Sequence, residues 1–266
     1  MLGEDYKDYC NKFNAVWKFL SSNSKNIDDI VKEICELRLY YNSFDRWKNI
    51  LSKVGVVFVS KETCDFSKLK RDDFKDLALF TDTGEFLLNE RYIIPVRDMI
   101  GNIIALIGWY PDSKKYITTP SKYFSKDCLF FGLEQLSDTG IGKNYFVVEG
   151  IFDCLIIQSL GYNAVACMGI TNSRIKETLF GLFRKVVAIP DNDTQGRRVL
   201  TRDLWRLPSN GSYLRWVGKI GLGDNNEESV NIKDIDRFCS LFEEDSIKEL
   251  FDTCFLSKER IIKIEI

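Results

Sequence analysis

The chain has 266 residues, of which 45% are hydrophobic and 29% are charged, and it carries a net charge of −2 without a single histidine. This length and composition are those of an ordinary globular protein with apolar residues for one large core or two modest ones. The lack of histidine excludes Ser-His-Asp and Cys-His catalysis. The lack of any Cys-x-x-Cys pair among eight cysteines also excludes a structural zinc module, so we expect chemistry based on carboxylates, lysine, arginine and a metal other than zinc.

No segment approaches the roughly 20 apolar residues that a membrane span requires. The polar, acidic start Met-Leu-Gly-Glu-Asp is not that of a signal peptide. Several cysteines, such as Cys154 and Cys167, fall within apolar runs, so we expect buried, reduced thiols. Together these features predict a cytoplasmic protein without a membrane partner.

Residues 1–80 are predicted to form a small helical layer. Apolar residues recur at helical spacing in 7–20, 27–39 and 46–54. A short apolar run at 56–59 predicts a strand. Nothing in this layer indicates chemistry, and we interpret it as a packing layer.

Residues 81–140 change to the period of β-strands and are predicted to form a mixed α+β basic subdomain. We expect strands at 91–96, 103–109 and 115–118, with a hairpin turn from Asp98 to Asn102 between the first two. Six basic and three acidic residues lie between Arg91 and Phe130. This part of the chain is therefore positively charged although the whole chain is not.

From residue 141 to residue 240 short apolar runs alternate with helical patterns. We predict strands at 145–148, 163–167, 185–189 and 212–217, and helices at 151–160, 173–182 and 194–206. Such alternation predicts an α/β fold, a mainly parallel sheet flanked by helices. An acidic loop at 221–229 and helices at 234–242 and 246–255 follow, and we expect 241–266 to be a helical tail.

Acidic residues directly follow two of these predicted strands. Glu149 comes after the first, with Asp153 in the next helical turn, and Asp191 and Asp193 come after the strand at 185–189. Open α/β sheets bind ligands at the carboxyl ends of their strands, and carboxylates gathered there repel one another unless cations lie between them. The pattern therefore predicts a hard-metal site. Taken singly, Glu149 and Asp153 could also be a turn residue and an ordinary helix start, and Asp191 and Asp193 could be an ordinary acidic turn.

A glycine and two arginines follow the second acidic pair. Gly196 permits close approach of the backbone, and Arg197 and Arg198 open the next predicted helix beside the carboxylates. Acids and bases juxtaposed at a strand end suit metal-bound phosphates. The two arginines could assist there or merely cap the acidic cluster, and both interpretations stay open.

Glu-Gly-x-x-Asp at 149–153 and Asp-x-Asp-x-x-Gly at 191–196 together resemble the TOPRIM domain of bacterial-type primases, topoisomerases, certain nucleases and recombination mediators. The resemblance implies a two-metal site for Mg²⁺ or Mn²⁺. It makes Glu149, Asp191 and Asp193 the catalytic metal ligands, with Asp153 supporting them. The run Lys233-Asp234-Ile235-Asp236 fits the third element of this family and adds Asp234 to the metal set.

The upstream block resembles the RNA polymerase domain of bacterial-type, DnaG-like primases. The likeness is carried, in the same order as in that family, by Arg91-Tyr-Ile-Ile-Pro-Val-Arg97-Asp98, by Lys115-Tyr-Ile-Thr-Thr-Pro120, and by Phe124-Ser-Lys126 through Leu129-Phe-Phe-Gly132-Leu133. The resemblance implies that the basic residues of this block bind the template and the incoming nucleotides. These residues are Arg91, Arg97, Lys115 and Lys126.

We therefore expect the catalytic core of a DNA primase, which makes short RNA primers on single-stranded DNA from ribonucleoside triphosphates. Without a zinc module or a helicase-binding domain, such a core would rely on a replicative helicase or a separate template-recognition protein. A compact phage or mobile-element origin would agree with this. Two alternatives share the TOPRIM fold: a nuclease, and a non-catalytic subunit that binds DNA or a replisome partner.

Overall fold

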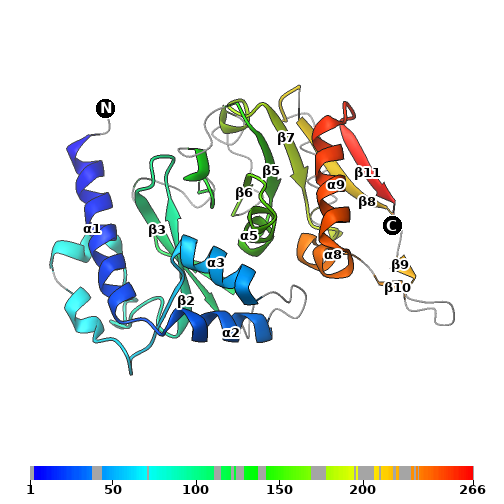
Figure 1. Cartoon of the computed structure of the whole chain (residues 1–266). Coiled ribbons are helices and arrows are strands. Elements are labelled where there is room, and N and C mark those ends of the chain that lie inside the picture. Colours follow the sequence, from blue (N-terminus) through cyan, green and yellow to red (C-terminus); the bar gives the residue numbers. More distant parts are fainter. Residues whose placement is uncertain are drawn as a thin grey trace. The chain divides into compact units, whose positions relative to one another are not determined.

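The fold is given by a computed structural model and consists of two compact units (Figure 1). The first unit contains the described residues up to Leu129, and the second contains the described residues from Phe130 onward. The structure describes residues 3–37, 44–70, 72–110, 115–120, 123, 129–136, 142–168, 178–194, 196, 207–209, 211–217, 220–221, 229–230, 232 and 234–265. The predicted domain divisions at 80 and 140 stay predictions.

The first unit begins with the predicted helical layer. Helices α1 (Glu4–Ser22), α2 (Ile27–Leu37) and α3 (Phe44–Val54) correspond to the three predicted helices. Each has an acidic residue in its first turn, where free N–H groups and the helix dipole stabilise negative charge. Two short 3₁₀ helices, η1 (Phe66–Leu69) and η2 (Asp72–Leu77), follow and were not predicted.

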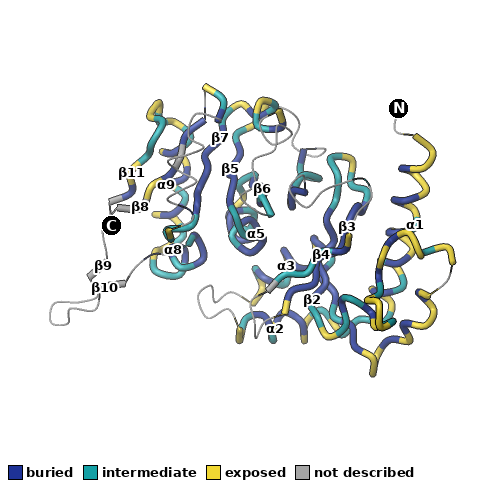
Figure 2. Tube along the Cα trace, turned by 180° about the vertical axis from the view of Figure 1, so that it is seen from behind, coloured by how far each residue is buried: buried dark blue, intermediate teal, exposed yellow. Residues whose placement is uncertain are grey.

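An antiparallel sheet of four strands, in the order β1-β2-β3-β4, forms the core of this unit. Its strands are β1 (Val57–Val59), β2 (Arg91–Arg97), β3 (Ile103–Tyr110) and β4 (Lys115–Thr118). All four were predicted. Strands β2 and β3 are buried over most of their length (Figure 2), and α1 packs against β3.

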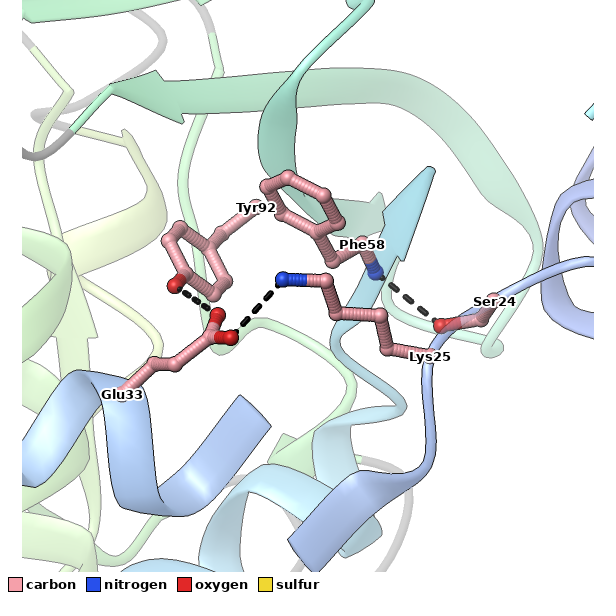
Figure 3. A network of polar contacts seen from close by, with 5 residues as sticks. All are labelled: Ser24, Lys25, Glu33, Phe58 and Tyr92. Atoms are coloured by element: carbon pink, nitrogen blue, oxygen red, sulfur yellow. Dashed lines mark hydrogen bonds and ion pairs between the residues drawn. The ribbon is translucent and has the colours of Figure 1, made fainter. Parts of the chain in front are cut away.

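A polar network ties the helical layer to this sheet (Figure 3). Glu33 accepts a hydrogen bond from the Tyr92 hydroxyl at 2.5 Å and pairs with Lys25 Nζ at 2.7 Å. Lys25 Nζ also lies 4.1 Å from the ring centroid of Phe58, whose N–H donates to Ser24 Oγ at 3.0 Å. Burial raises the pKa of Glu33, but the hydrogen bonds from Lys25 and Tyr92 outweigh it and leave that pKa below its ordinary value. The network is therefore strongest with Glu33 ionised.

The second unit contains a five-stranded parallel sheet in the order β11-β8-β7-β5-β6. The strands are β5 (Asn144–Val148), β6 (Ala164–Ala166), β7 (Lys185–Ile189), β8 (Gly211–Val217) and β11 (Ile261–Glu265). The predicted mainly parallel α/β sheet is confirmed.

Both faces of this sheet are covered at its centre. Tyr145 stacks on Phe183 at 4.1 Å between ring centroids, whereas Phe146 lies 4.6 Å from Phe251 in helix α9 (Glu244–Leu256). Successive side chains of a strand point to opposite faces, so these two contacts lie on different sides of the sheet. Helix α5 (Ile151–Ser159) packs against β5 and β6.

Strand β11 corrects the prediction of a helical tail. Helices α8 (Ile235–Leu241) and α9 (Glu244–Leu256) agree with the two closing helices, but Ile261–Glu265 then pairs with β8. The physical reason lies in the sequence, because β-branched isoleucines alternate with Lys263 and Glu265 at the period of a strand.

Some predicted elements fall largely outside the described residues, namely the helices at 173–182 and 194–206 and the acidic loop at 221–229. Short strands β9 (Ile220–Gly221) and β10 (Ser229–Val230) pair beside that loop. The seven described cysteines are free thiols. Of the helices that the structure describes, none is both long enough and apolar enough to traverse a bilayer.

Candidate metal centre

The parallel register between β5 and β7 aligns the first two acidic segments. Val148, the last residue of β5, is paired with Ile189, the last residue of β7. Glu149 and Asp191 therefore leave the sheet at the same edge. The backbone N–H of Asp191 donates to Glu149 Oε1 at 3.3 Å, and both residues are half-buried. The structure thus brings these two predicted ligands together.

Gly196 lies against the backbone of Asp191. A Cβ atom at position 196 would lie 1.9 Å from the carbonyl oxygen of Asp191, so only glycine fits there. Glycine at this position lets the two stretches of backbone approach each other closely. The N–H of Gly196 donates to Asp193 Oδ1 at 2.8 Å. One carboxylate oxygen of Asp193, a predicted ligand, is therefore hydrogen-bonded within the turn.

Two hydrogen bonds tie the third acidic segment to this edge. Asn192 Nδ2 donates to the carbonyl oxygen of Ile232 at 2.9 Å. The N–H of Asp236 donates to Asp153 Oδ1 at 3.3 Å, and Asp236 is 2% exposed. Neither Asn192 nor Asp236 was predicted to have a role at this edge. For Asp236, the sequence offered one indication, because the Asp-x-Asp spacing at 234–236 repeats that at 191–193.

Asp153 and Asp234 both have local structural roles. Asp153 folds over Gly150, where an added Cβ would lie 2.4 Å from its Oδ2. Asp234 is the N-cap of α8, and its Oδ1 accepts a hydrogen bond from the Arg237 N–H at 2.9 Å. These contacts position the starts of α5 and α8 at the acidic edge.

Cys154 lies next to Asp153 but is a packing residue. Burial, and then the nearby charges of Glu134 and Asp153, raise the pKa of the Cys154 thiol well above its ordinary value. Its sulfur lies 3.2 Å from the Ala164 carbonyl oxygen and 3.2 Å from Gln158 Nε2. A thiol that stays protonated is not a metal ligand, because the thiolate is the form that binds metals.

The donors at this edge are carboxylate oxygens, which are the ligands that Mg²⁺ and Mn²⁺ prefer. One Glu149 oxygen accepts the backbone N–H of Asp191, and Asp193 and Asp234 each direct one oxygen to a neighbouring N–H. Within the described part of the chain, no three acidic or cysteine side chains form a ready-made metal-binding group. The donor set fits a hard divalent cation in its chemistry, because all its members are carboxylates.

The predicted nucleic-acid-binding residues with described side chains are the two arginines of β2. Arg91 opens the strand, and its guanidinium carbon lies 5.4 Å from the ring centroid of Tyr110. Arg97 closes the strand, and its Nη1 donates to the Gly101 carbonyl oxygen at 3.2 Å. Lys115 opens β4. The predicted side chains that lie outside the described residues are those of Lys115, Lys126, Arg197 and Arg198.

Comparison with known proteins places this site in a wider context. The Toprim-like family matches residues 146–228. A primase from Aquifex aeolicus, comprising zinc-binding and RNA polymerase domains, matches with 21% identity and a TM-score of 0.68. The match covers 95% of this chain but only 62% of the Aquifex chain, less than two thirds of it.

Two further solved structures are similar over most of both chains. The DnaG primase catalytic domain bound to single-stranded DNA matches with 18% identity and a TM-score of 0.67, covering 93% of this chain and 81% of that one. The Escherichia coli primase catalytic core matches with 18% identity and a TM-score of 0.66, covering 92% and 79% respectively. No curated protein sequence matches the chain. The chain therefore contains a Toprim-like region and has the fold of a DnaG primase catalytic core.

Proposed function

We propose that the protein is the catalytic core of a DNA primase and makes short RNA primers on single-stranded DNA. The observation that carries this proposal is the meeting of Glu149 and Asp191 at one edge of the parallel sheet. A Toprim-like region by itself would also suit a nuclease. The likeness to primase catalytic domains extends through the basic subdomain of the first unit, and this extent favours polymerisation of nucleotides over hydrolysis.

The carboxylates would hold Mg²⁺ or Mn²⁺. Glu149, Asp191 and Asp193 are the proposed ligands, with Asp153 or Asp234 in support. Bound metal would activate the primer 3′-hydroxyl and stabilise the leaving pyrophosphate. The chain itself orients the ligands, because the Asp191 N–H binds one oxygen of Glu149 and the turn at Gly196 holds Asp193.

The basic side chains would bind the substrates. Arg91, Arg97, Lys115 and Lys126 would neutralise phosphates of the template and of the incoming ribonucleoside triphosphate. Arg197 and Arg198 would contribute at the acidic edge. A replicative helicase or a template-recognition protein is the proposed further partner. The DNA-bound relative supports single-stranded DNA as the template.

A primer-synthesis assay tests the proposal. The protein is incubated with single-stranded DNA, labelled ribonucleotides and Mg²⁺ or Mn²⁺, with and without an annealed RNA primer that bypasses initiation. Asp191→Asn, which keeps the backbone N–H that binds Glu149, should lower synthesis by about 100-fold or more. Asp245→Asn removes the same charge from an exposed position in the first turn of α9 and should leave synthesis unchanged.

Three results would overturn the proposal. Wild-type protein that neither starts nor extends a primer is not a primase core. Template degradation that depends on Asp191 would indicate a nuclease instead. Wild-type synthesis by Asp191→Asn would place the chemistry elsewhere.

A further inference from the structure

The turn between β2 and β3 is organised by the carboxylate of Asp98. Its Oδ1 accepts hydrogen bonds from the N–H groups of Ile100 at 3.0 Å and Asn102 at 2.9 Å, and its Oδ2 accepts one from Asn102 Nδ2 at 3.0 Å. The Gly101 N–H donates to the Asp98 carbonyl oxygen at 3.1 Å. Gly101 has a φ of 88°, which glycine adopts readily. The shape of this turn therefore depends on Asp98.

A further hydrogen bond to Asp98 comes from a distant part of the sequence. The hydroxyl of Tyr6 in α1, 92 residues earlier, donates to Asp98 Oδ2 at 2.7 Å. Tyr6 is 8% exposed and Asp98 is half-buried, so this contact is partly shielded from water. Burial, and then the carboxylate of Asp98, raise the pKa of Tyr6. The hydroxyl stays protonated at neutral pH and keeps donating.

The orientation of Arg97 follows from the same turn. Its Nη1 donates to the carbonyl oxygen of Gly101 at 3.2 Å, and Gly101 is placed by Asp98. The pairing of β2 with β3 also shifts register between Val96 and Arg97, an irregularity of the kind that re-aims a side chain. One line of contacts thus leads from Tyr6 through Asp98 and Gly101 to the guanidinium.

We propose that Tyr6 is a positioning residue for Arg97, and that the Arg97 guanidinium binds a phosphate of single-stranded DNA. The inference rests on the proposed function, because that function makes Arg97 a nucleic-acid contact. Arginine binds phosphate through a rigid fork of N–H groups, so its orientation matters as well as its charge. Loss of the Tyr6 hydroxyl would leave the charge of Arg97 in place but would weaken the contacts that fix the orientation of its guanidinium.

Binding measurements on four variants test this. The probe is a fluorescent single-stranded oligonucleotide, and its Kd is measured by anisotropy for Tyr6→Phe, Arg97→Ala, the double variant and Tyr9→Phe. Tyr9 is the matched control, since its hydroxyl donates from the same helix to the Ile104 carbonyl oxygen in β3 at 3.2 Å and not to Asp98. Thermal unfolding and circular dichroism compare the folding of all four variants.

Tyr6→Phe should raise Kd by about 3-fold to 10-fold, the range of one hydrogen bond. Arg97→Ala should raise it at least as much, and the double variant should bind like Arg97→Ala alone, because a positioning effect disappears with the group that is positioned. Tyr9→Phe should bind like the wild type. A purely structural role of Tyr6 would not give this non-additivity.

Several outcomes overturn the inference. Unchanged binding by Tyr6→Phe, or a further loss when Tyr6→Phe is added to Arg97→Ala, would show that Tyr6 does not act through Arg97. An equal loss in Tyr9→Phe would show a general effect of α1. Unchanged binding by Arg97→Ala would also overturn it, whereas the proposed function would stand if primer synthesis still required Asp191.

Discussion

Replacement of Gly196 by alanine tests whether the acidic edge depends on the backbone of Asp191. The new Cβ would lie 1.9 Å from the Asp191 carbonyl oxygen, whereas ordinary contact begins at 3.4 Å. The shortfall is about 1.5 Å, the difference of those two distances. Because the obstacle is main chain, no side-chain rotation relieves it. The backbone at Asp191 or at residue 196 must move, and either movement changes the turn that joins them.

The size of that movement determines the expected losses of stability and of catalytic rate. Overpacking of this kind costs about 1–3 kcal/mol of unfolding free energy. Misplacement of a catalytic group by about 1 Å lowers rates by about 100-fold. We therefore expect Gly196→Ala to fold, with a modestly lower Tm, and to lose primer extension by about two orders of magnitude. Thermal unfolding and primer-extension rates measured on the same preparation give both numbers.

Gly150→Ala is the matched comparison. Its Cβ would lie 2.4 Å from Asp153 Oδ2, the end of a side chain that can rotate away. The loss of activity should therefore be smaller than in Gly196→Ala. Wild-type extension and stability in Gly196→Ala would refute the reasoning, and so would a larger loss of activity in Gly150→Ala.

Three further predictions concern stability. Glu33→Gln should lower the unfolding free energy at pH 7 by roughly 0.5–1 kcal/mol, after allowance for solvent screening of its pair with Lys25. Because the pKa of Glu33 is lowered below its ordinary 4.5, this stabilisation is present above that pH and is lost as pH falls through the folded-state pKa. Urea unfolding at pH 7 and pH 3 should show the difference shrink, and an undiminished difference would contradict the assignment. Asp234→Ala should lower the unfolding free energy by about 1 kcal/mol, because the Arg237 N–H loses its hydrogen-bond acceptor. Asp234→Asn keeps an acceptor oxygen and should lower it little. Equal losses of stability in the two variants, measured by thermal unfolding, would contradict the capping role of Asp234. Phe251→Ala should cost about 3–5 kcal/mol in urea unfolding, because its ring is fully buried, and a loss below about 1 kcal/mol would show that the core relaxes around it.

The strands could be predicted because local patterns specify them. The apolar runs at 145–148 and 185–189 stop shortly before acids, and β5 and β7 end where these runs end, at Val148 and Ile189. Strand β11 was missed because its short run follows a clear helical pattern and was taken as its continuation. The strand-end rule also placed Glu149 and Asp191 correctly at one edge.

Other parts of the site depend on contacts between distant segments, which no local pattern encodes. The hydrogen bond from Asn192 to Ile232 spans 40 residues, and the one from Asp236 to Asp153 spans 83. The capping role of Asp234 is different. It is local, and an aspartate just before a helical pattern predicts it.

The paired ends of β5 and β7 make the distance between Glu149 and Asp191 a property of the sheet. Removing one residue within 145–148 would shift Glu149 by about 3.3 Å along the strand and turn its side chain to the other face. Changes of length between the two strands would leave the pairing intact only where they fall outside α5 and β6, which pack against β5. Insertions and deletions should therefore be better tolerated outside α5 and β6 than inside β5 or β7, even where every acidic residue is retained.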